Sequence, residues 1–420
     1  MSPNTTKEHK GESSLVDSKK RILFVVEAMG GGVFTYIVDL ANGLVDKYDM
    51  YIAYAVRPQT PSGYKDYFDK KIHLIEVKNF TRSVESSKDI KAFLEIKRIA
   101  DKVKPDIIHL HSSKAGALGR WAFNGKKTPL FYTPHGYSFL MKNHSAVKRF
   151  TYKMIETVSG VRSCTTISCS EGEHQETLKL TKRATYVDNG INMEQLDSLL
   201  TSIQSDENHP FTVFTLGRIC YQKNPMLFNE IAKALPGIHF LWIGDGELRE
   251  ELTSSNIGIT GWLDRKNALS RSVSADVFLL TSLWEGLPIS LLEAMYMKKP
   301  CVVNDVIGNH DVIHSGVNGY VCQNVSEFVE SIENAQGDKS AGLVDAAYED
   351  ILNKYNTVIM AEKYSAIYDE ALVRFGGGYY YLVYIQSATF ISLTVHSLPT
   401  ANIQITLWST TAAVHEKAVA

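Results

Sequence analysis

Short apolar runs alternate with longer amphipathic stretches along most of this chain of 420 residues. Runs such as RILFVVE (21–27) and DIIHLH (106–111) are continuous, which is typical of strands that are buried on both faces. Between them lie stretches with helical periodicity, such as VFTYIVDLANGLVDK (33–47). Strands that are separated by helices form βαβ units, so the sequence predicts parallel sheets covered by helices on both faces.

The alternation is interrupted by a polar stretch, TSIQSDENHP, which ends in proline and is typical of a linker. A chain of 420 residues is also too long for one ordinary core. We therefore predict an α/β protein with two doubly wound, Rossmann-like domains that face a central cleft, the usual place for a ligand. The predicted parts are a flexible tail (1–20), a first domain (21–200), the linker (201–210), a second domain (211–350) and crossover helices (351–374).

The C-terminal residues 375–420 differ in composition from both predicted domains. Before Glu416 they contain no aspartate, glutamate, lysine or arginine. Apolar residues alternate with polar ones on both sides of Pro399–Asn402, namely Ile391, Leu393 and Val395 before it and Ile403, Ile405 and Leu407 after it. A period of two predicts a β-hairpin in a β-rich tail. Its role stays open between an added β element, an edge that binds a partner and a tail without a native role.

The overall composition excludes several classes of protein. With 44% hydrophobic and 21% charged residues the chain is globular, and its net charge of −2 gives no reason to expect a nucleic-acid partner. The five cysteines are scattered without a CxxC pair, which favours reduced thiols in a cytoplasmic protein. The polar start lacks the apolar region of a signal peptide, and no apolar run has the length of a membrane span. Any membrane contact is therefore predicted to be peripheral.

Several turns after predicted strands carry glycines or basic residues. The turn AMGGG precedes a helix, so the N–H groups of its glycines can approach a ligand; the turn matches neither the dinucleotide fingerprint nor a Walker A loop, and a tight turn without ligand is the alternative. Arg218 and Lys223 follow another strand and suit a diphosphate, unless they form an ordinary solvated turn. The residues that expose backbone at these turns are Gly30, Gly31, Gly32, Gly217, Gly244, Gly261 and Trp262.

Three histidines lie near the ends of two neighbouring strands in the first domain. His135 follows one strand, and His109 and His111 end the preceding one. Histidines at such positions are either catalytic groups or hydrogen-bonded residues of the core. No metal site is predicted: Asp245 and Glu247 have a spacing found among metal-binding carboxylates, but they enter a helix and have no histidine or cysteine nearby.

The stretch WEGLPISLLEAM contains two glutamates with seven residues between them. Pro288 suits the first turn of a helix, which places Glu285 in the loop before that helix and Glu293 within it. The dipeptide Gly286-Leu287 offers N–H groups beside Glu285. Ionised carboxylates accept hydrogen bonds from vicinal hydroxyls, so the pair can hold two polyols. The alternatives are an acid–base pair of the glycosidase type and two solvated glutamates.

Taken together, these motifs resemble glycosyltransferase family 4, the retaining nucleotide-sugar transferases of GT-B fold. The resemblance covers roughly residues 21–374 and rests on NGI, GRICYQKNP, GDGEL, GW and EGLPISLLE. The stretches HSSKAGALGR and YTPHGYSFL are similar to members that build bacterial capsular, exopolysaccharide or O-antigen repeat units. The sequence departs from the family pattern at Leu287-Pro288, where Phe-Gly is common, and at Asp311, where glutamate is frequent.

The resemblance implies a role for each motif. Glu293 would bind the ribose of the nucleotide, and Glu285 the hydroxyls of the donor sugar. Residues implied to be catalytic are Glu285, Arg218, Lys223 and His135. Residues implied to bind the donor are Glu293, Gly286, Leu287, Pro288, Ile289, Gly217, Gly244, Gly261 and Trp262. The loop of Gly30, Gly31 and Gly32 would approach the phosphates, and His111 and Lys114 are candidates for acceptor contacts.

The same resemblance implies the partners. The donor would be a nucleotide sugar, with a UDP-sugar as first choice, and the acceptor a saccharide, commonly polyprenyl-linked, at the inner face of the plasma membrane. Neither a cofactor nor a metal is expected. The basic amphipathic stretch 141–158 suits an anionic membrane surface, or is an ordinary surface helix. The alternatives are a nucleotide-sugar 2-epimerase or phosphorylase of the same fold, and a non-catalytic sugar-binding subunit.

Overall fold

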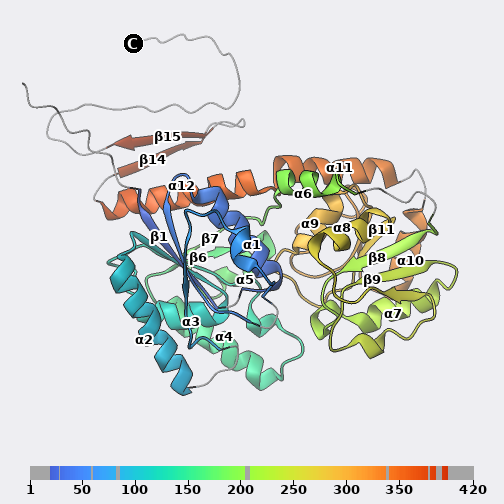
Figure 1. Cartoon of the computed structure of the whole chain (residues 1–420), viewed down its shortest axis with the longest axis horizontal. Helices are drawn as coiled ribbons and strands as arrows, with labels where there is room; N and C mark the ends of the chain where they lie inside the picture. The colour runs from blue at the N-terminus through green and yellow to red at the C-terminus, as the bar shows by residue number, and fades with distance from the viewer. Residues whose placement is uncertain are drawn as a thin grey trace, which may run out of the picture.

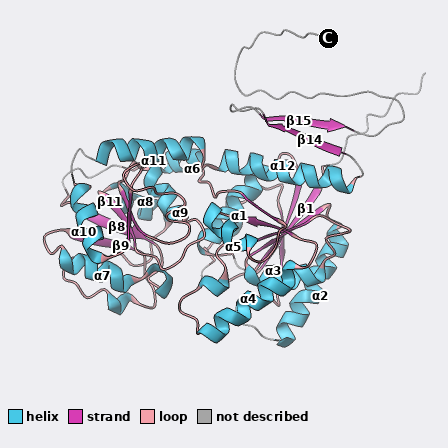
Figure 2. Ribbon diagram, turned by 180° about the vertical axis from the view of Figure 1, so that it is seen from behind, coloured by secondary structure: helices cyan, strands magenta, loops and turns pink. Residues whose placement is uncertain are grey.

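Two parallel β-sheets, each covered by helices, form the two halves of the molecule (Figure 1). The computed structural model describes residues 19–27, 29–57, 60–81, 86–203, 209–336, 340–376, 379–384 and 390–395. Viewed from behind, helices lie on both sides of the strands in each half (Figure 2). The α/β architecture expected from the alternating pattern is therefore confirmed.

The first sheet contains seven parallel strands in the order β3-β2-β1-β4-β5-β6-β7. They are β1 (Arg21–Val26), β2 (Asp49–Tyr54), β3 (His73–Glu76), β4 (Ile107–His111), β5 (Leu130–Thr133), β6 (Thr165–Ser168) and β7 (Ala184–Tyr186). The helices of this half are α1 (Gly31–Leu44), α2 (Ser86–Val103), α3 (Ser113–Ala122), α4 (Ala146–Gly160) and α5 (Glu171–Leu178), with short 3-10 turns η1 (Tyr64–Tyr67) and η2 (Ser138–Leu140).

Strand β1 shows why its apolar run is continuous. Ile22, Phe24 and Val26 pack in the core on the α1 side of the sheet. Leu23 and Val25 point to the opposite face and pack in the core beneath α2 and α3. Successive side chains of a strand alternate between faces, so a strand that is covered on both sides needs apolar residues at every position.

The second sheet contains six parallel strands in the order β10-β9-β8-β11-β12-β13. They are β8 (Thr212–Leu216), β9 (His239–Ile243), β10 (Ile257–Ile259), β11 (Val277–Leu280), β12 (Cys301–Asn304) and β13 (Tyr320–Cys322). The helices of this half are α6 (Met193–Leu200), α7 (Pro225–Ala234), α8 (Arg265–Val273), α9 (Ile289–Tyr296), α10 (Val325–Asn334) and α11 (Ala341–Asn353), with 3-10 turns η3 (Tyr221–Lys223) and η4 (Arg249–Glu251).

Helix α6 precedes the polar stretch 201–210 but packs with the second half. Leu196 lies in the same core cluster as Phe214 of β8 and Leu292 of α9. The chain therefore passes from the first half to the second before α6, whereas the sequence places the linker after it. Helix α6 belongs to the second half because its apolar face can be buried only against a neighbouring core.

Helix α12 (Thr357–Phe375) crosses back from the second half to the first (Figure 1). Its N-terminus is capped by Asn356, whose side chain accepts a hydrogen bond from the N–H of Ile359 at 3.0 Å. Tyr364 and Tyr368 are buried in the core of the first half, and the Tyr364 hydroxyl bonds that of Tyr36 on α1. The last helix of the body thus completes the core of the first domain.

The described part of the C-terminal tail is an antiparallel pair of strands, β14 (Tyr379–Tyr384) and β15 (Phe390–Val395). The predicted strand over residues 391–395 forms and pairs with β14, whereas the predicted partner stretch 403–407 lies outside the described residues. The aromatic and β-branched run YYYLVY has high strand propensity and lies closer in sequence than 403–407. The predicted pairing across Pro399–Asn402 involves residues outside the described part of the chain and stays a prediction.

Candidate functional site

The loop between β11 and α9 brings Glu285 to the junction of the two halves. Trp284 and Leu287 are buried on either side of Glu285 and anchor the loop. Pro288 is the N-cap residue of α9, one position earlier than a first-turn proline. Across the junction, Nδ2 of Asn189, which follows β7, donates to the carbonyl oxygen of Leu287 at 2.8 Å. The loop is thus fixed by contacts from both halves.

Glu285 is only 8% exposed and is held by two side chains from the turn after β8. Its Oε1 lies 2.7 Å from Nζ of Lys223, and its Oε2 accepts a hydrogen bond from Nε2 of Gln222 at 3.2 Å. Nε2 of Gln222 also donates to the carbonyl oxygen of Trp284 at 3.0 Å. A buried carboxylate with a matched cation can stay ionised, so Glu285 is prepared to accept hydroxyl donors.

Glu293 lies within α9, where it is 3% exposed, and forms an ion pair with α8. Its Oε1 lies 2.7 Å from Nη2 of Arg265. Asp39 of α1, from the opposite half, is 5% exposed and interacts electrostatically with both residues. Burial raises the pKa of Asp39 to about 7; the positive charge of Arg265 opposes this shift and the negative charge of Glu293 adds to it. Two carboxylates from different domains therefore face one guanidinium.

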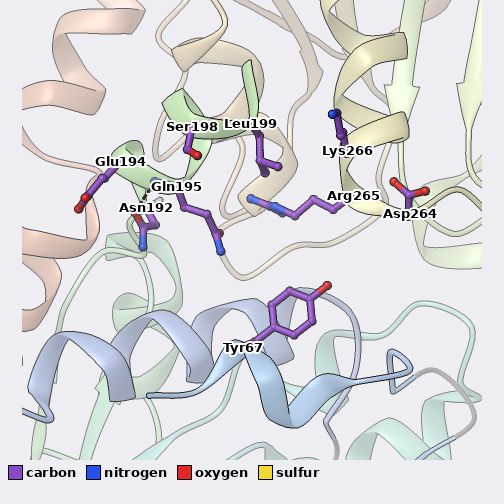
Figure 3. Close-up of a pocket in the computed structure, with 9 residues that line it drawn as sticks. All are labelled: Tyr67, Asn192, Glu194, Gln195, Ser198, Leu199, Asp264, Arg265 and Lys266. Carbon is purple, nitrogen blue, oxygen red and sulfur yellow. Dashed lines mark hydrogen bonds between the residues drawn. The ribbon is translucent and has the colours of Figure 1, made fainter. Parts of the chain in front are cut away.

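A pocket of about 530 Å³ opens next to this ion pair. It lies between Tyr67 of η1, helix α6 and the N-terminal part of α8, with Arg265 extending along it (Figure 3). Arg265 therefore connects the pocket with Glu293. The pocket wall is mixed in charge, since Glu194 and Asp264 accompany Arg265 and Lys266.

Three glycines line the carboxyl edge of the second sheet. Gly217, Gly244 and Gly261 have φ angles of 146°, 139° and 73°, a region that favours glycine. A Cβ on Gly244 would come within 2.2 Å of the Gly217 carbonyl oxygen, so these turns require glycine. Arg218 next to them pairs with Glu247, with 2.9 Å between Nε and Oε2, and Trp262 is exposed.

The turn after β5 brings His135 to the same junction. His135 has a φ of 56°, a left-handed conformation that is uncommon for residues other than glycine and marks many functional sites. Its Nε2 lies 3.2 Å from Nδ1 of His111, and burial lowers its pKa to about 3. A Cβ on Gly286 would lie 3.5 Å from the carbonyl carbon of His135, so the two loops are in contact. The structure therefore brings His135 next to the Glu285 loop.

The glycine turn before α1 is open. A Cβ on Gly31 or Gly32 would meet no atom within 4 Å among the described residues. Gly30 is the N-cap residue of α1 and has an extended backbone. Such a helix N-terminus, free of neighbours, leaves N–H groups accessible to an anion.

Two residues that the sequence assigns to the acceptor are engaged inside the first half. His111 is 0% exposed, so it offers no surface to an acceptor in this structure. Lys114 Nζ lies 2.6 Å from Oδ1 of Asp89 and donates to the carbonyl oxygen of Thr81 at 2.6 Å. Their spacing in the sequence resembles the family motif. In the structure, however, His111 is buried and Lys114 is paired within the first half.

Sequence reasoning missed Asp39, Gln222 and Arg265 as parts of the site. Asp39 stands in the apolar stretch of α1 and carries no motif that separates it from a surface position. Gln222 lies inside the motif GRICYQKNP, so the turn that supplies Lys223 was the available signal for it. For Arg265, which begins α8, no signal was available.

Within the described residues, no cluster of three or more histidine, cysteine, aspartate or glutamate side chains is arranged to bind a metal. Asp245 and Glu247, the pair with metal-like spacing, each contact an arginine: Asp245 pairs with Arg249 and Glu247 with Arg218.

Two doubly wound α/β domains that meet in this way have the arrangement of the GT-B fold, and structural comparison supports this fold class. Sucrose-phosphate synthase from Thermosynechococcus elongatus superposes with a TM-score of 0.69 at 15% identity, over 84% of this chain and 99% of that one. The Anabaena protein HepE, solved with UDP and glucose, superposes with a TM-score of 0.65 at 16% identity, over 84% of this chain and all of that one. At this identity the likeness shows the fold.

Sequence comparison shows the family. Residues 30–195 match the family model described as Glycosyltransferase Family 4, and residues 210–338 match Glycosyl transferases group 1. The UDP-Gal:alpha-D-GlcNAc-diphosphoundecaprenol alpha-1,3-galactosyltransferase of Escherichia coli is 30% identical over 73% of this chain and 86% of that protein. An N-acetyl-D-galactosaminyltransferase of Campylobacter jejuni, named for an oligosaccharide linked to PP-undecaprenol, is 25% identical over 66% of this chain and 77% of that protein. The chain belongs to glycosyltransferase family 4.

Proposed function

We propose that this glycosyltransferase transfers a sugar from a UDP-sugar, with retention of configuration, to a polyprenyl-linked saccharide during the synthesis of a bacterial surface polysaccharide. The observation that carries the proposal is the pairing of Glu285 with Lys223 at 2.7 Å, beside the His135 turn of the other domain. A carboxylate that can accept hydrogen bonds from sugar hydroxyls (Glu285) and a cation that can bind phosphate (Lys223) therefore lie next to each other between the domains. The names of the Escherichia coli and Campylobacter relatives, which specify diphosphoundecaprenol and PP-undecaprenol, support the acceptor class.

The two carboxylates have different tasks in this proposal. Glu293 accepts hydrogen bonds from the ribose hydroxyls after Arg265 moves aside, and Glu285 accepts them from the donor sugar. The N–H groups of Gly286, Leu287 and Ile289, together with Gly217, Gly244, Gly261 and Trp262, supply the remaining donor contacts. The open turn of Gly31 and Gly32 lies at a helix N-terminus, which suits the phosphates.

Charge neutralisation by side chains replaces a metal in the proposed reaction. As the bond between the sugar and the diphosphate breaks, negative charge grows on the phosphate oxygens, and Arg218 and Lys223 stabilise it. The acceptor hydroxyl attacks from the face that the diphosphate leaves, and the leaving phosphate takes its proton. Retention follows because attack and departure share one face of the sugar.

A polyprenyl-linked acceptor requires contact with a membrane surface, and we assign this contact to α4. Val147 and Phe150 of this helix are 77% and 65% exposed, and they stand among the exposed basic residues Lys148 and Arg149. In the described part of the chain, none of the helices combines the length and hydropathy of a membrane span. The proposal is therefore peripheral attachment through an apolar and basic surface.

A screen of UDP-, GDP- and ADP-sugars for binding and turnover tests the proposal. Turnover with a UDP-sugar is expected, and the anomeric coupling constants of the product in proton NMR should match those of the donor. Glu285→Gln should lower kcat about 100-fold while UDP still binds, and Glu250→Gln, at an exposed glutamate of η4, should change neither. An inverted anomer, or no binding of any nucleotide sugar, would refute the proposal.

A further inference from the structure

His111 lies directly behind His135 in the first domain. Its Nδ1 faces Nε2 of His135 at 3.2 Å, and the side chain is fully buried. Aromatic rings of Phe24 and Tyr36 flank it, with ring centres 4.7 and 6.0 Å away. This contact between two histidines replaces the acceptor contact that the sequence suggests for His111.

The second nitrogen of His111 indicates where the protons are. Nε2 of His111 is buried and meets no hydrogen-bond partner among the described residues. Both histidines are neutral at pH 7, because burial lowers the pKa of each, and a neutral imidazole carries its proton on one nitrogen only. A buried N–H without an acceptor is rarer in proteins than a buried acceptor without a donor. The proton of His111 therefore belongs on Nδ1.

We propose that His111 is a positioning residue that fixes His135 in the Nδ1–H tautomer. His111 donates from Nδ1 to Nε2 of His135, so the proton of His135 must lie on Nδ1, the ring nitrogen directed away from His111. Within the described part of the chain, no hydrogen bond engages Nδ1 of His135. The inference rests on the proposed function, in which His135 contacts the donor sugar, and it makes that contact a donation to a sugar or phosphoryl oxygen.

The surroundings of His135 support a fixed ring. The ring of Tyr36 packs edge-on against it, with the centres 4.6 Å apart. The next residue is also held, because the N–H of Gly136 donates to Oε1 of the buried Glu173 at 2.6 Å. Packing against Tyr36, the hydrogen bond of the Gly136 N–H and the contact with His111 together fix the ring of His135. Its free nitrogen therefore points in one direction, which reduces the reorganisation needed when the donor binds.

The tautomer is measurable without any ligand. Long-range proton–nitrogen correlation spectra of protein labelled with 15N-histidine distinguish Nδ1–H from Nε2–H, and the variant His135→Gln identifies the signals of His135. Both His111 and His135 should be protonated on Nδ1. A wild-type spectrum with His135 protonated on Nε2 would overturn the inference, whatever the enzyme turns over.

Two substitutions at His111 then separate positioning from folding. In His111→Asn the side-chain amide lies near the place of Nδ1 and can still donate, so kcat/KM should stay within about threefold, whereas His111→Phe loses one hydrogen bond and should lower it about tenfold. The variant His111→Phe should also show both tautomers of His135. Tyr368→Phe, which removes a 2.6 Å contact with His109 and leaves His111 untouched, is the matched control.

The outcomes distinguish this inference from the proposed function. If His111→Asn and His111→Phe are both folded and have equal kinetics, the inference fails, and the proposed function stands as long as Glu285→Gln is inactive. If the wild type turns over no nucleotide sugar, the proposed function fails, and the spectra still decide the tautomer. If His111→Phe does not fold, the wild-type spectrum and His111→Asn provide the test.

Discussion

At the scale of single residues, the two glutamates Glu285 and Glu293 at the junction each have a cationic neighbour. Glu285 is paired with Lys223, and Glu293 with Arg265, at 2.7 Å in both cases. Asp39 differs, because no hydrogen bond engages its carboxylate within the described part of the chain and it shares Arg265 with Glu293. A buried charge without its own partner is unfavourable, so Asp39 makes the protein sensitive to pH.

The variant Asp39→Asn tests this sensitivity. Folding raises the pKa of Asp39 from 3.8 to about 7, so the folded state binds its proton more tightly than the unfolded state. The resulting stabilisation is complete below pH 3.8 and is lost as the pH rises through 7. Relative to Asp39→Asn, the wild type should therefore lose about 2–4 kcal/mol of unfolding free energy between pH 4 and pH 8.

Urea unfolding at several pH values measures this difference. The fully exposed Asp46, two residues beyond the end of α1, supplies the control variant Asp46→Asn, for which the difference from wild type should stay small over the same range. Parallel stability curves for wild type and Asp39→Asn would contradict the prediction.

The sequence allowed part of the site to be predicted. Glu285, Glu293 and Lys223 stand in recognisable motifs; the structure places Glu285 and Lys223 on neighbouring turns at one sheet edge and Glu293 in the helix α9 that follows Glu285. Asp39 and Arg265 were not predictable, because their significance depends on how the two domains meet, and this is not encoded in the periodicity of α1 or α8. His111 and Lys114 were assigned acceptor contacts from motif likeness, whereas in the structure His111 is buried and Lys114 pairs with Asp89.

At the scale of elements, α4 combines a firm anchor with an exposed surface. Glu156 on its inner face pairs with Arg120 of α3, with 2.6 Å between Oε2 and Nη2, and accepts a hydrogen bond from the hydroxyl of Tyr132 at 3.0 Å. Its outer face exposes Val147, Phe150, Met154, Ile155 and Val158. The ion pair keeps the helix in place on the domain, so the apolar residues of its outer face are free to contact a membrane surface.

Substitutions on α4 should weaken binding to anionic membranes. Phe150→Ser with Met154→Ser should lower the affinity for phosphatidylglycerol vesicles about tenfold or more, because two large apolar side chains no longer enter the interface. Lys148→Glu with Lys153→Glu should lower it by a similar factor, since each lost positive charge weakens attraction to the surface by about 1 kcal/mol.

Cosedimentation with vesicles measures both effects. The matched control is Ile90→Ser with Leu94→Ser on α2, which also removes two exposed apolar residues, and its affinity should equal that of the wild type. Equal losses for the α2 and α4 variants would show that apolar exposure in general, and not α4, determines binding.

The elements themselves were predictable where their side-chain pattern is strong. Continuous apolar runs located β1 and β4 to within one residue. Strand β7 was missed, because its three residues Ala-Thr-Tyr have no apolar run. Alternation identifies strands but does not say which two strands pair, and the predicted partner stretch 403–407 lies outside the described residues.

At the scale of the whole molecule, Asp311 connects the two halves. Its Oδ2 accepts hydrogen bonds from the N–H of Gly172 at the start of α5 in the first half, at 3.1 Å, and from that of Gly308 in the second half, at 3.0 Å. One carboxylate oxygen thus bridges the two domains. The same position is where the sequence departs from the family pattern, with aspartate in place of glutamate.

The variant Gly172→Ala should separate the halves. Its Cβ would come within 2.7 Å of both carboxylate oxygens of Asp311, so the contact cannot form without movement. The radius of gyration from solution scattering should increase without nucleotide, and UDP affinity should fall about fivefold to tenfold, because binding must then also close the domains.

Gly237→Ala is the control for this experiment, since a Cβ there meets no described atom within 4 Å. Its scattering profile and UDP affinity should match those of the wild type. A Gly172→Ala profile that is identical to that of the wild type would exclude Asp311 as the contact that sets the distance.

The return of α12 to the first domain has a consequence for the chain during its synthesis. Met360, Tyr364 and Tyr368 complete the core beneath α1, yet they leave the ribosome long after the strands that they cover. At about 5–20 residues per second, the roughly 180 residues between Tyr186 and Tyr368 take about 10–35 s to translate. For that time the nascent first domain exposes an apolar groove where α12 will lie. The first domain can therefore complete its core only after the second domain has been translated, and the groove is where a chaperone would bind the growing chain.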